Sequence, residues 1–125
     1  MMKIVRCEKC GKIAGIIQDS ACPTKCCGEP MAVLEANTSD GALEKHVPVV
    51  EIDGSLVTVT VGEALHPMLD AHYIQWILLE TNKGMSRRPL NPGDAPKAQF
   101  ALTEGEEVIA AYEYCNLHGF WKKEL

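Results

Sequence analysis

The stretch Tyr114–Trp121 holds the residues best suited to chemistry in this chain of 125. It places Cys115 three residues before His118, and Gly119 follows, which permits a backbone conformation with positive φ. A thiolate and an imidazole in one short loop can both bind the same metal ion. This stretch is therefore the first candidate for a metal site.

The chain has four histidines, and the other three lie in segments expected to be loops beside strands. They are His46, His66 and His72. Each one alone would more often be a surface residue than a ligand. Together with Cys115 and His118 they give five donors, more than a structural tetrahedral zinc site uses. Nitrogen and thiolate donors suit iron, copper or zinc, and five of them leave one octahedral position open. We expect all five at one iron.

A second set of donors lies in a small N-terminal module, expected to span residues 1–36. Its four cysteines are Cys7, Cys10, Cys26 and Cys27. The first two are separated by two residues and followed by Gly11, which relieves the tight turn between them. Four thiolates suit tetrahedral zinc or a single iron, so a zinc ribbon remains an alternative. Because the module has few apolar residues, its metal is expected to supply much of the folding energy.

Composition limits the classes of function. The chain has 12 basic and 17 acidic residues, a net charge of −5, which argues against a general nucleic-acid binder. Neither a secretory signal nor an apolar run long enough to span a bilayer is recognisable, so we expect a soluble, cytoplasmic protein without membrane contact. In a reducing cytosol cysteines are ligands or thiols rather than disulfides. Cys22, outside the set of four, is expected to be a free thiol.

From residue 37 onward the sequence alternates as β-strands do. Val47–Ile52 and Leu56–Val61 flank Asp53-Gly54-Ser55, and Asp-Gly between β-branched runs is a strong hairpin signal. In the second run the valines fall on one face and the threonines on the other, as a half-buried strand requires. This part of the chain is therefore expected to begin with a hairpin.

Four more strands follow the hairpin. They are expected at Tyr73–Thr81, Met85–Leu90, Lys97–Leu102 and Val108–Tyr114. In the first of them Ile74, Trp76 and Leu78 are expected on one side, and Trp76, Phe100 and Trp121 are expected in the core or at an interface. Short strands at this spacing predict an all-β fold, a sandwich of antiparallel sheets over residues 37–125.

These motifs resemble a known family. The four-cysteine pattern resembles desulforedoxin, and three stretches resemble desulfoferrodoxin, the two-iron superoxide reductase family. The stretches are Glu44–Pro48, His66–Met68 and Tyr114–Gly119. The resemblance runs in order over essentially the whole chain. It implies a desulforedoxin-like module on an immunoglobulin-like sandwich, in a protein that is typically a homodimer.

The resemblance also implies roles for single residues. The four cysteines would hold one iron, and the four histidines would bind a second iron in its equatorial plane, with Cys115 as axial ligand. Two neighbouring residues are catalytic candidates: Glu44 would occupy the open position after oxidation, and Lys45 would be the cation near incoming superoxide. We further expect the backbone N–H groups of Asn116 and Leu117 to donate to the Cys115 sulfur.

The expected reaction is the one-electron reduction of superoxide to hydrogen peroxide, with a rubredoxin-like external electron donor. The alternative is a non-catalytic iron protein that only carries electrons. A third and less favoured reading is an interaction module whose metal is a structural zinc. The open coordination position favours the enzyme, because a pure carrier gains little from exposing its metal to oxidants.

Overall fold

The computed structural model describes residues 2–39 and 41–125, and the chain divides into two compact units. The N-terminal unit is Met1–Glu35 and the sandwich unit is Ala36–Leu125. Nearly all regular structure in both units is β-strand, and the helix α1 (Leu43–His46) is a single turn. The expected all-β fold is confirmed. Within the described residues, no helix has the length and apolar character that a membrane crossing needs.

The N-terminal unit contains two small antiparallel sheets. Its strands are β1 (Lys3–Arg6), β2 (Ile13–Ile16), β3 (Lys25–Cys26), β4 (Glu29–Pro30) and β5 (Ala32–Val33). β1 pairs with both β2 and β5, and β3 pairs with β4. Among the described residues of this unit, buried apolar side chains are confined to Ile4, Val5 and Cys7. The unit therefore has almost no hydrophobic core of its own.

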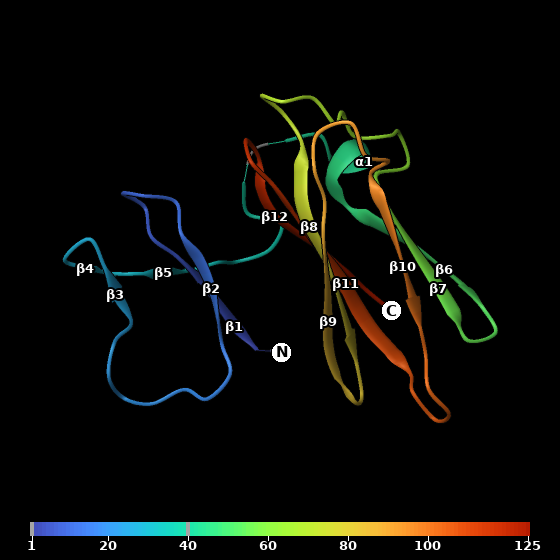
Figure 1. Ribbon diagram of the computed structural model, residues 1–125, viewed down its shortest axis with the longest axis horizontal. Coiled ribbons are helices and arrows are strands. Elements are labelled where there is room, and N and C mark those ends of the chain that lie inside the picture. Colours follow the sequence, from blue (N-terminus) through green and yellow to red (C-terminus); the bar gives the residue numbers. More distant parts are fainter. Residues whose placement is uncertain (1, 40) are drawn as a thin grey trace. The chain divides into compact units, whose positions relative to one another are not determined.

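The sandwich unit consists of two antiparallel sheets. One has three strands in the order β10-β7-β6, and the other has four in the order β12-β11-β8-β9 (Figure 1). The strands are β6 (Pro48–Asp53), β7 (Leu56–Val61), β8 (Ile74–Thr81), β9 (Gly84–Pro89), β10 (Lys97–Ala101), β11 (Val108–Cys115) and β12 (Gly119–Glu124). Six of these seven strands match predicted strands to within one residue at each end, and the antiparallel sandwich is confirmed.

Alternating apolar residues from the two sheets form the core between them. Val57, Val59 and Val61 of β7 are fully buried and pack in one cluster with Ile77 and Leu79 of β8. The threonines of β7 are only half-buried, so the predicted two-faced pattern of this strand is confirmed. At the tip of the β6–β7 hairpin Gly54 has φ of 60°, and a positive φ is what the Asp-Gly pair predicts for this turn.

The predicted face of β8 was wrong because of a β-bulge. Tyr114 pairs with Trp76 but Cys115 pairs with Ile74, so Gln75 is an extra residue on β8. The bulge reverses the alternation, and Ile74 joins the core cluster while Trp76 stacks on Tyr114 at 5.6 Å on the other face. A bulge depends on the partner strand, so the alternation within one strand does not reveal it.

A second difference is β12 (Gly119–Glu124), which was not predicted. Its six residues pair in register with β11 over its whole length. Trp121 and Phe120 of this strand are buried, at 1% and 2% exposure. Lys122 and Lys123, in the second half of the strand, obscure its β-strand pattern in the sequence. The strand forms because β11 offers it a complete hydrogen-bonding edge.

Acid should weaken one anchored turn of the sandwich unit. Glu106, between β10 and β11, accepts hydrogen bonds from the Thr81 hydroxyl at 2.6 Å and from the Thr103 N–H at 2.9 Å. These bonds, the Thr81 bond foremost, lower the pKa of Glu106 below its ordinary value of 4.5. A lowered pKa in the folded state stabilises the fold above the unfolded value, and this stabilisation is lost as pH falls through the lowered pKa.

We therefore expect Glu106→Gln to lower the urea midpoint at pH 7, and the difference from the native chain to shrink below pH 4.5. Both chains should be compared metal-free, because acid protonates metal ligands. A midpoint difference that is as large at pH 3 as at pH 7 would show that the carboxylate charge is not what matters.

Candidate metal centres

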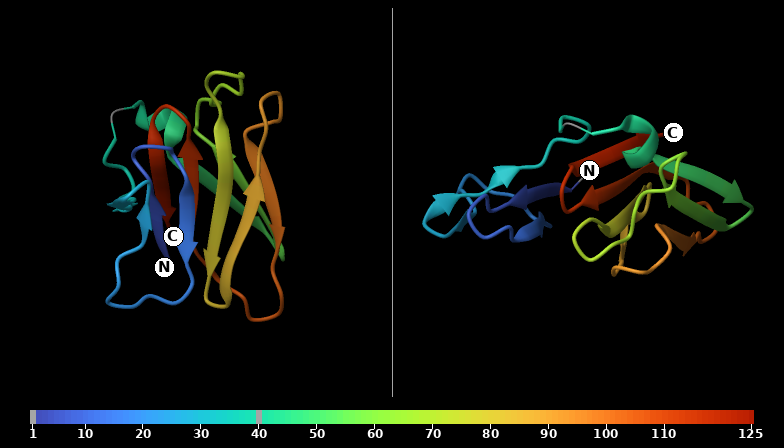
Figure 2. Two further views of the ribbon diagram at one scale, coloured as in Figure 1. Left: turned by 60° about the vertical axis from the view of Figure 1, so that its left-hand side comes forward. Right: turned by 90° about the horizontal axis from the view of Figure 1, so that it is seen from above.

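Three chain segments meet at one end of the sandwich and bring the five predicted donors together. Figures 1 and 2 show α1, the β7–β8 connection and the β11–β12 turn at this end. His46 ends α1, and two donors come from the β7–β8 connection. The donors are His46, His66, His72, Cys115 and His118, and their ligand atoms all lie within 4.8 Å of one another. Residues far apart in the sequence thus form one cluster, called the five-donor centre below.

The sequence led us to expect His46 in a loop, but the structure places it in a helix. It is the last residue of α1, whose single turn is closed by the Val47 N–H bonding to the Leu43 carbonyl at 3.0 Å. Pro48 then starts β6, and the residue before a proline is biased away from helix, so the turn stops there. The short helix places a buried His46 next to two exposed residues, Glu44 and Lys45.

The four imidazoles form a closed cycle. Neighbouring ring centroids are 4.7 to 5.0 Å apart, in the order His46, His66, His72, His118 and back to His46. Each ring is inclined to its neighbours by 72° to 84°. Cys115 joins this cycle as the fifth donor, with its Sγ 3.8 Å from the Nδ1 of His118. Four nitrogens around a ring and one thiolate are the donor set of a five-ligand metal site.

Hydrogen bonds decide which ring nitrogen each histidine offers. The Nδ1 of His46 lies 2.8 Å from the Ala42 carbonyl, and the Nδ1 of His66 lies 2.7 Å from the Pro67 carbonyl. An N–H at these positions leaves Nε2 free as the ligand atom. His118 differs, because its Nδ1 faces the cluster, 3.0 Å from the Nε2 of His46.

Two buried nitrogens lack a protein partner, which is what a metal site requires. The Nε2 atoms of His66 and His72 are buried without any hydrogen bond among the described residues. Burial also lowers the pKa of His46 and His72 below 6.5, and that of His66 to about 4. These imidazoles are therefore neutral at pH 7, the form that binds metals. The residues present fit an iron or another nitrogen- and thiolate-binding metal.

The sulfur of Cys115 is fully buried at the end of β11. Burial raises the pKa of its thiol, and the backbone N–H groups of Leu117 and His118 oppose that shift by donating to the sulfur. The expectation that Asn116 is one of the two donors was wrong, because its N–H bonds to the Tyr73 carbonyl at 3.2 Å. Gly119, with φ of 83°, permits the tight turn that aims these N–H groups.

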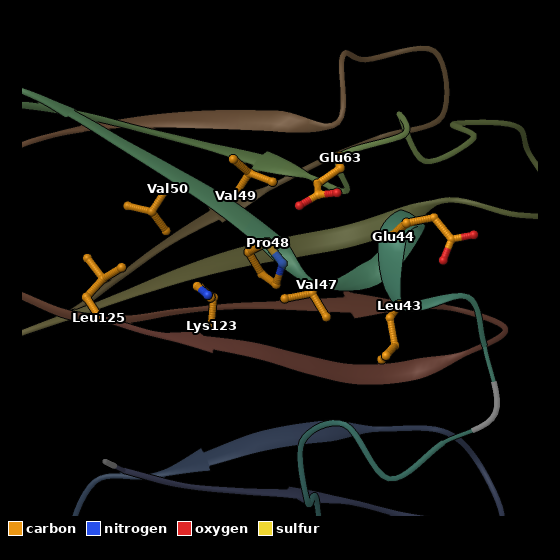
Figure 3. Close-up of a pocket in the computed structure, with 9 residues that line it drawn as sticks. All are labelled: Leu43, Glu44, Val47, Pro48, Val49, Val50, Glu63, Lys123 and Leu125. Carbon is orange, nitrogen blue, oxygen red and sulfur yellow. The ribbon is translucent and has the colours of Figure 1, made fainter.

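The two catalytic candidates are the exposed residues that directly precede His46 in α1. Lys45 is exposed, and its charge is one of the influences that lower the pKa of His72, after burial and His118. Glu44 lies at the end of a groove of about 460 Å³ between β6 and β12, where Figure 3 shows its carboxylate turned away from Pro48. Its carboxylate is not one of the converging donor atoms.

The four predicted cysteines of the N-terminal unit also converge. Their sulfur atoms lie within 4.8 Å of one another, and these residues are Cys7, Cys10, Cys26 and Cys27. The backbone N–H of Cys10 donates to the Sγ of Cys7 and is the main reason that the pKa of this thiol falls to about 6. Cys27 has a positive φ of 53°, which lets two adjacent cysteines face one point. This set is called the four-cysteine centre.

Cys22 lies outside both centres, as expected. It is exposed, and it forms no disulfide in the described part of the chain. Its backbone N–H donates to the Ser20 hydroxyl at 3.3 Å, which holds its loop.

Sequence reasoning missed Glu113. This residue of β11 is completely buried, and neither carboxylate oxygen has a hydrogen-bond partner among the described residues. Burial raises its pKa well above the ordinary value. It lies on the same inward face of β11 as Ala111 and Cys115. Its two-residue spacing from Cys115 was the one signal in the sequence that it is buried. An acidic residue is usually exposed, and that expectation outweighed the pattern.

Comparisons with known proteins agree with this geometry. Residues 38–124 match the protein-family model described as Desulfoferrodoxin. The chain is 45% identical over 122 residues to a desulfoferrodoxin of Nitratidesulfovibrio vulgaris, covering 98% of this chain and 95% of that one. The chain belongs to the desulfoferrodoxin family.

Solved structures of similar proteins have the same fold as this desulfoferrodoxin. A superoxide reductase from Treponema pallidum is 36% identical, with a TM-score of 0.83 over 99% of both chains. A superoxide reductase from Giardia intestinalis is 34% identical, with a TM-score of 0.55, and covers 66% of this chain and 99% of its own. As a desulfoferrodoxin, this chain carries two donor groups that could bind iron.

Proposed function

We propose that the protein is a superoxide reductase. Superoxide takes up one electron and two protons at the five-donor centre and leaves as hydrogen peroxide. The observation that carries this proposal is the convergence of four imidazoles and one thiolate within 4.8 Å, a set that leaves one octahedral position open. The proteins of Treponema pallidum and Giardia intestinalis that share this fold are named superoxide reductases, which supports it.

Iron bound by the five donors would supply the single electron that superoxide takes up. The residues around it prepare that transfer. Cys115, whose sulfur receives the N–H groups of Leu117 and His118, would bind the iron as a thiolate and donate electron density to it. His72 and His118 are only half-buried, so water reaches this side and supplies protons to the leaving peroxide.

Lys45 guides the substrate to this side. Superoxide is an anion and the chain has a net charge of −5, so attraction must come from a local positive field. Lys45 is exposed, and its charge acts on His72 at the accessible edge of the centre. Glu44, the preceding residue, is proposed as the carboxylate that would occupy the open position of an oxidised iron.

Lys45→Ala should slow the second-order reaction with superoxide by about 10-fold at low ionic strength, the lower end of electrostatic steering. The salt dependence of the rate should also weaken, because salt screens a field that the variant lacks. Pulse radiolysis of the reduced protein at several ionic strengths measures both.

Lys83→Ala is the matched control. Lys83 lies beyond the far end of β8, more than about 20 Å along the strand from the centre. Removing the same charge there should leave the rate and its salt dependence unchanged. Equal effects of the two substitutions would mean that only net charge matters.

The N-terminal unit, for which the sequence predicts residues 1–36, is proposed to hold a second iron in its four-cysteine centre. Four thiolates without a nitrogen donor suit electron transfer or structure rather than substrate binding. We propose a rubredoxin-like protein as the external donor and a homodimer as the working assembly, both on the strength of the family.

One experiment tests the function. The reduced, iron-loaded protein is mixed anaerobically with a pulse of superoxide, and oxidation of the five-donor centre, peroxide and dioxygen are followed together. Peroxide with stoichiometric oxidation and no protein-dependent dioxygen is the expected result. Dioxygen released with peroxide would mean dismutation, and superoxide decay no faster than in buffer would favour an electron carrier.

A further inference from the structure

Trp121 packs directly against the five-donor centre without being a donor itself. It lies on β12 with 1% exposure. Its ring stacks on the imidazole of His46, with centroids 4.9 Å apart and planes inclined by 28°. Its indole N–H donates to the backbone carbonyl of His118 at 3.0 Å. A single buried residue therefore touches two of the four histidines, one through its face and one through its edge.

The ring of His46 is held in two ways. Its Nδ1 lies 2.8 Å from the Ala42 carbonyl, which fixes rotation in the ring plane, and Trp121 covers one face, which prevents tilting. Gly41 closes the arrangement, because a Cβ added there would lie 3.1 Å from Trp121 and 3.2 Å from His46. The backbone thus approaches this stacked pair as closely as a glycine allows.

His118 is held through its backbone. It lies in the β11–β12 turn, and its Nδ1 faces the Nε2 of His46 at 3.0 Å. Trp121 is the third residue of β12, and its indole N–H donates to the His118 carbonyl, which links the turn to this strand. The turn therefore cannot open without breaking this bond, and the bond and the stacking share one rigid side chain.

We propose that Trp121 is a positioning residue of the five-donor centre, which fixes His46 and His118 relative to each other before a metal binds. The inference rests on the proposed function only in requiring that the five donors bind a metal. Groups that hydrogen-bond to metal ligands change metal affinity about 10- to 100-fold when they are removed, and we expect a loss of the same order for Trp121.

The test is Co²⁺ binding to the metal-free full chain, followed by ligand-field and thiolate absorption. Trp121→Leu removes both the stacking and the N–H donor and should weaken binding at the five-donor centre about 10- to 100-fold. It should also shift the ligand-field bands, because the imidazoles reorient. Trp121→Phe keeps an aromatic face but no donor and should fall between. The four-cysteine centre, whose all-thiolate absorption is distinct, serves as an internal reference in every titration.

Phe120→Leu is the matched control. Phe120 is the neighbouring residue of β12, 2% exposed, and it stacks on Tyr112 with ring centroids 5.5 Å apart, away from the histidines of the centre. This variant also loses a buried aromatic ring, although a smaller one, so an effect of general destabilisation appears in it as well. We expect its Co²⁺ affinity and spectrum to match those of the native chain.

Equal losses in Trp121→Leu and Phe120→Leu would overturn the inference, and so would native affinity and spectrum in Trp121→Leu. Should Trp121→Leu fail to fold, the comparison of Trp121→Phe with Phe120→Leu decides in the same way. A native chain that binds Co²⁺ only at the four-cysteine centre would count against the proposed function itself. A native chain that binds at both centres, with an unaffected Trp121→Leu, would count against the role of Trp121 alone.

Discussion

Replacing Cys115 with serine is expected to remove the sulfur-to-iron charge-transfer absorption of the five-donor centre and to slow superoxide reduction by about 100-fold or more. Loss of a residue that only orients a ligand costs up to about 100-fold, so loss of the ligand itself should cost at least as much. The substituted hydroxyl is a poorer electron donor than a thiolate. Stopped-flow absorption of the iron-loaded protein measures the band and the rate together.

Cys22→Ser is the matched control for this experiment. It makes the same atomic replacement at an exposed cysteine outside both donor groups, so band and rate should stay at native values. Retention of the band and the rate in Cys115→Ser would refute the role of the sulfur as an iron ligand. Loss of the rate with the four-histidine site still loaded would assign the electron-donating role to the thiolate.

Removing metal should unfold the N-terminal unit and leave the sandwich unit folded. Only Ile4, Val5 and Cys7 are buried in the described part of the N-terminal unit, whereas the sandwich unit has a continuous core between two sheets. Structural zinc in zinc-finger peptides supplies about 10 to 16 kcal/mol of apparent binding free energy, which is then folding free energy, and we expect the metal of the four-cysteine centre to act in the same way. A chelator withdraws that contribution from the unit that has little else.

Hydrogen exchange detected by mass spectrometry resolves the two units. With a strong chelator, peptides covering β1 and β2 should lose nearly all protection, and peptides covering β7, β8 and β11 should keep theirs. The sandwich peptides are thus the control within the same molecule. Persistent protection of β1 in metal-free protein would show that the few buried side chains suffice.

Much of this fold and of its donor sets could be predicted from the sequence. The β6–β7 hairpin follows from Asp53-Gly54 between alternating runs, because local residue types determine that turn. The nine donors could be chosen because cysteine and histidine are scarce in this chain and their spacing is distinctive. Local patterns and rare residue types are the information that a single sequence carries.

The rest depends on partners distant in the sequence. The extra residue Gln75 in β8 is defined only by pairing with β11. The buried carboxyl of Glu113 contradicts the ordinary preference of glutamate for solvent, and only the packed sandwich reveals it. Which N–H groups reach the Cys115 sulfur likewise depends on the path of the β11–β12 turn, where Tyr73 engages Asn116 instead.

The backbone bonds that orient His46 and His66 have a further consequence for speed. Electron transfer is slowed when atoms around the redox centre must move between the two oxidation states. Here two imidazoles are fastened by Nδ1 contacts of 2.8 and 2.7 Å to main-chain carbonyls, and the main chain belongs to a short helix and a strand connection. A preorganised polar environment spends little energy on rearrangement at the moment of reaction. We therefore expect an iron-loaded centre to have a small reorganisation energy, so that the arrival of superoxide and of protons would set the pace of the proposed reaction.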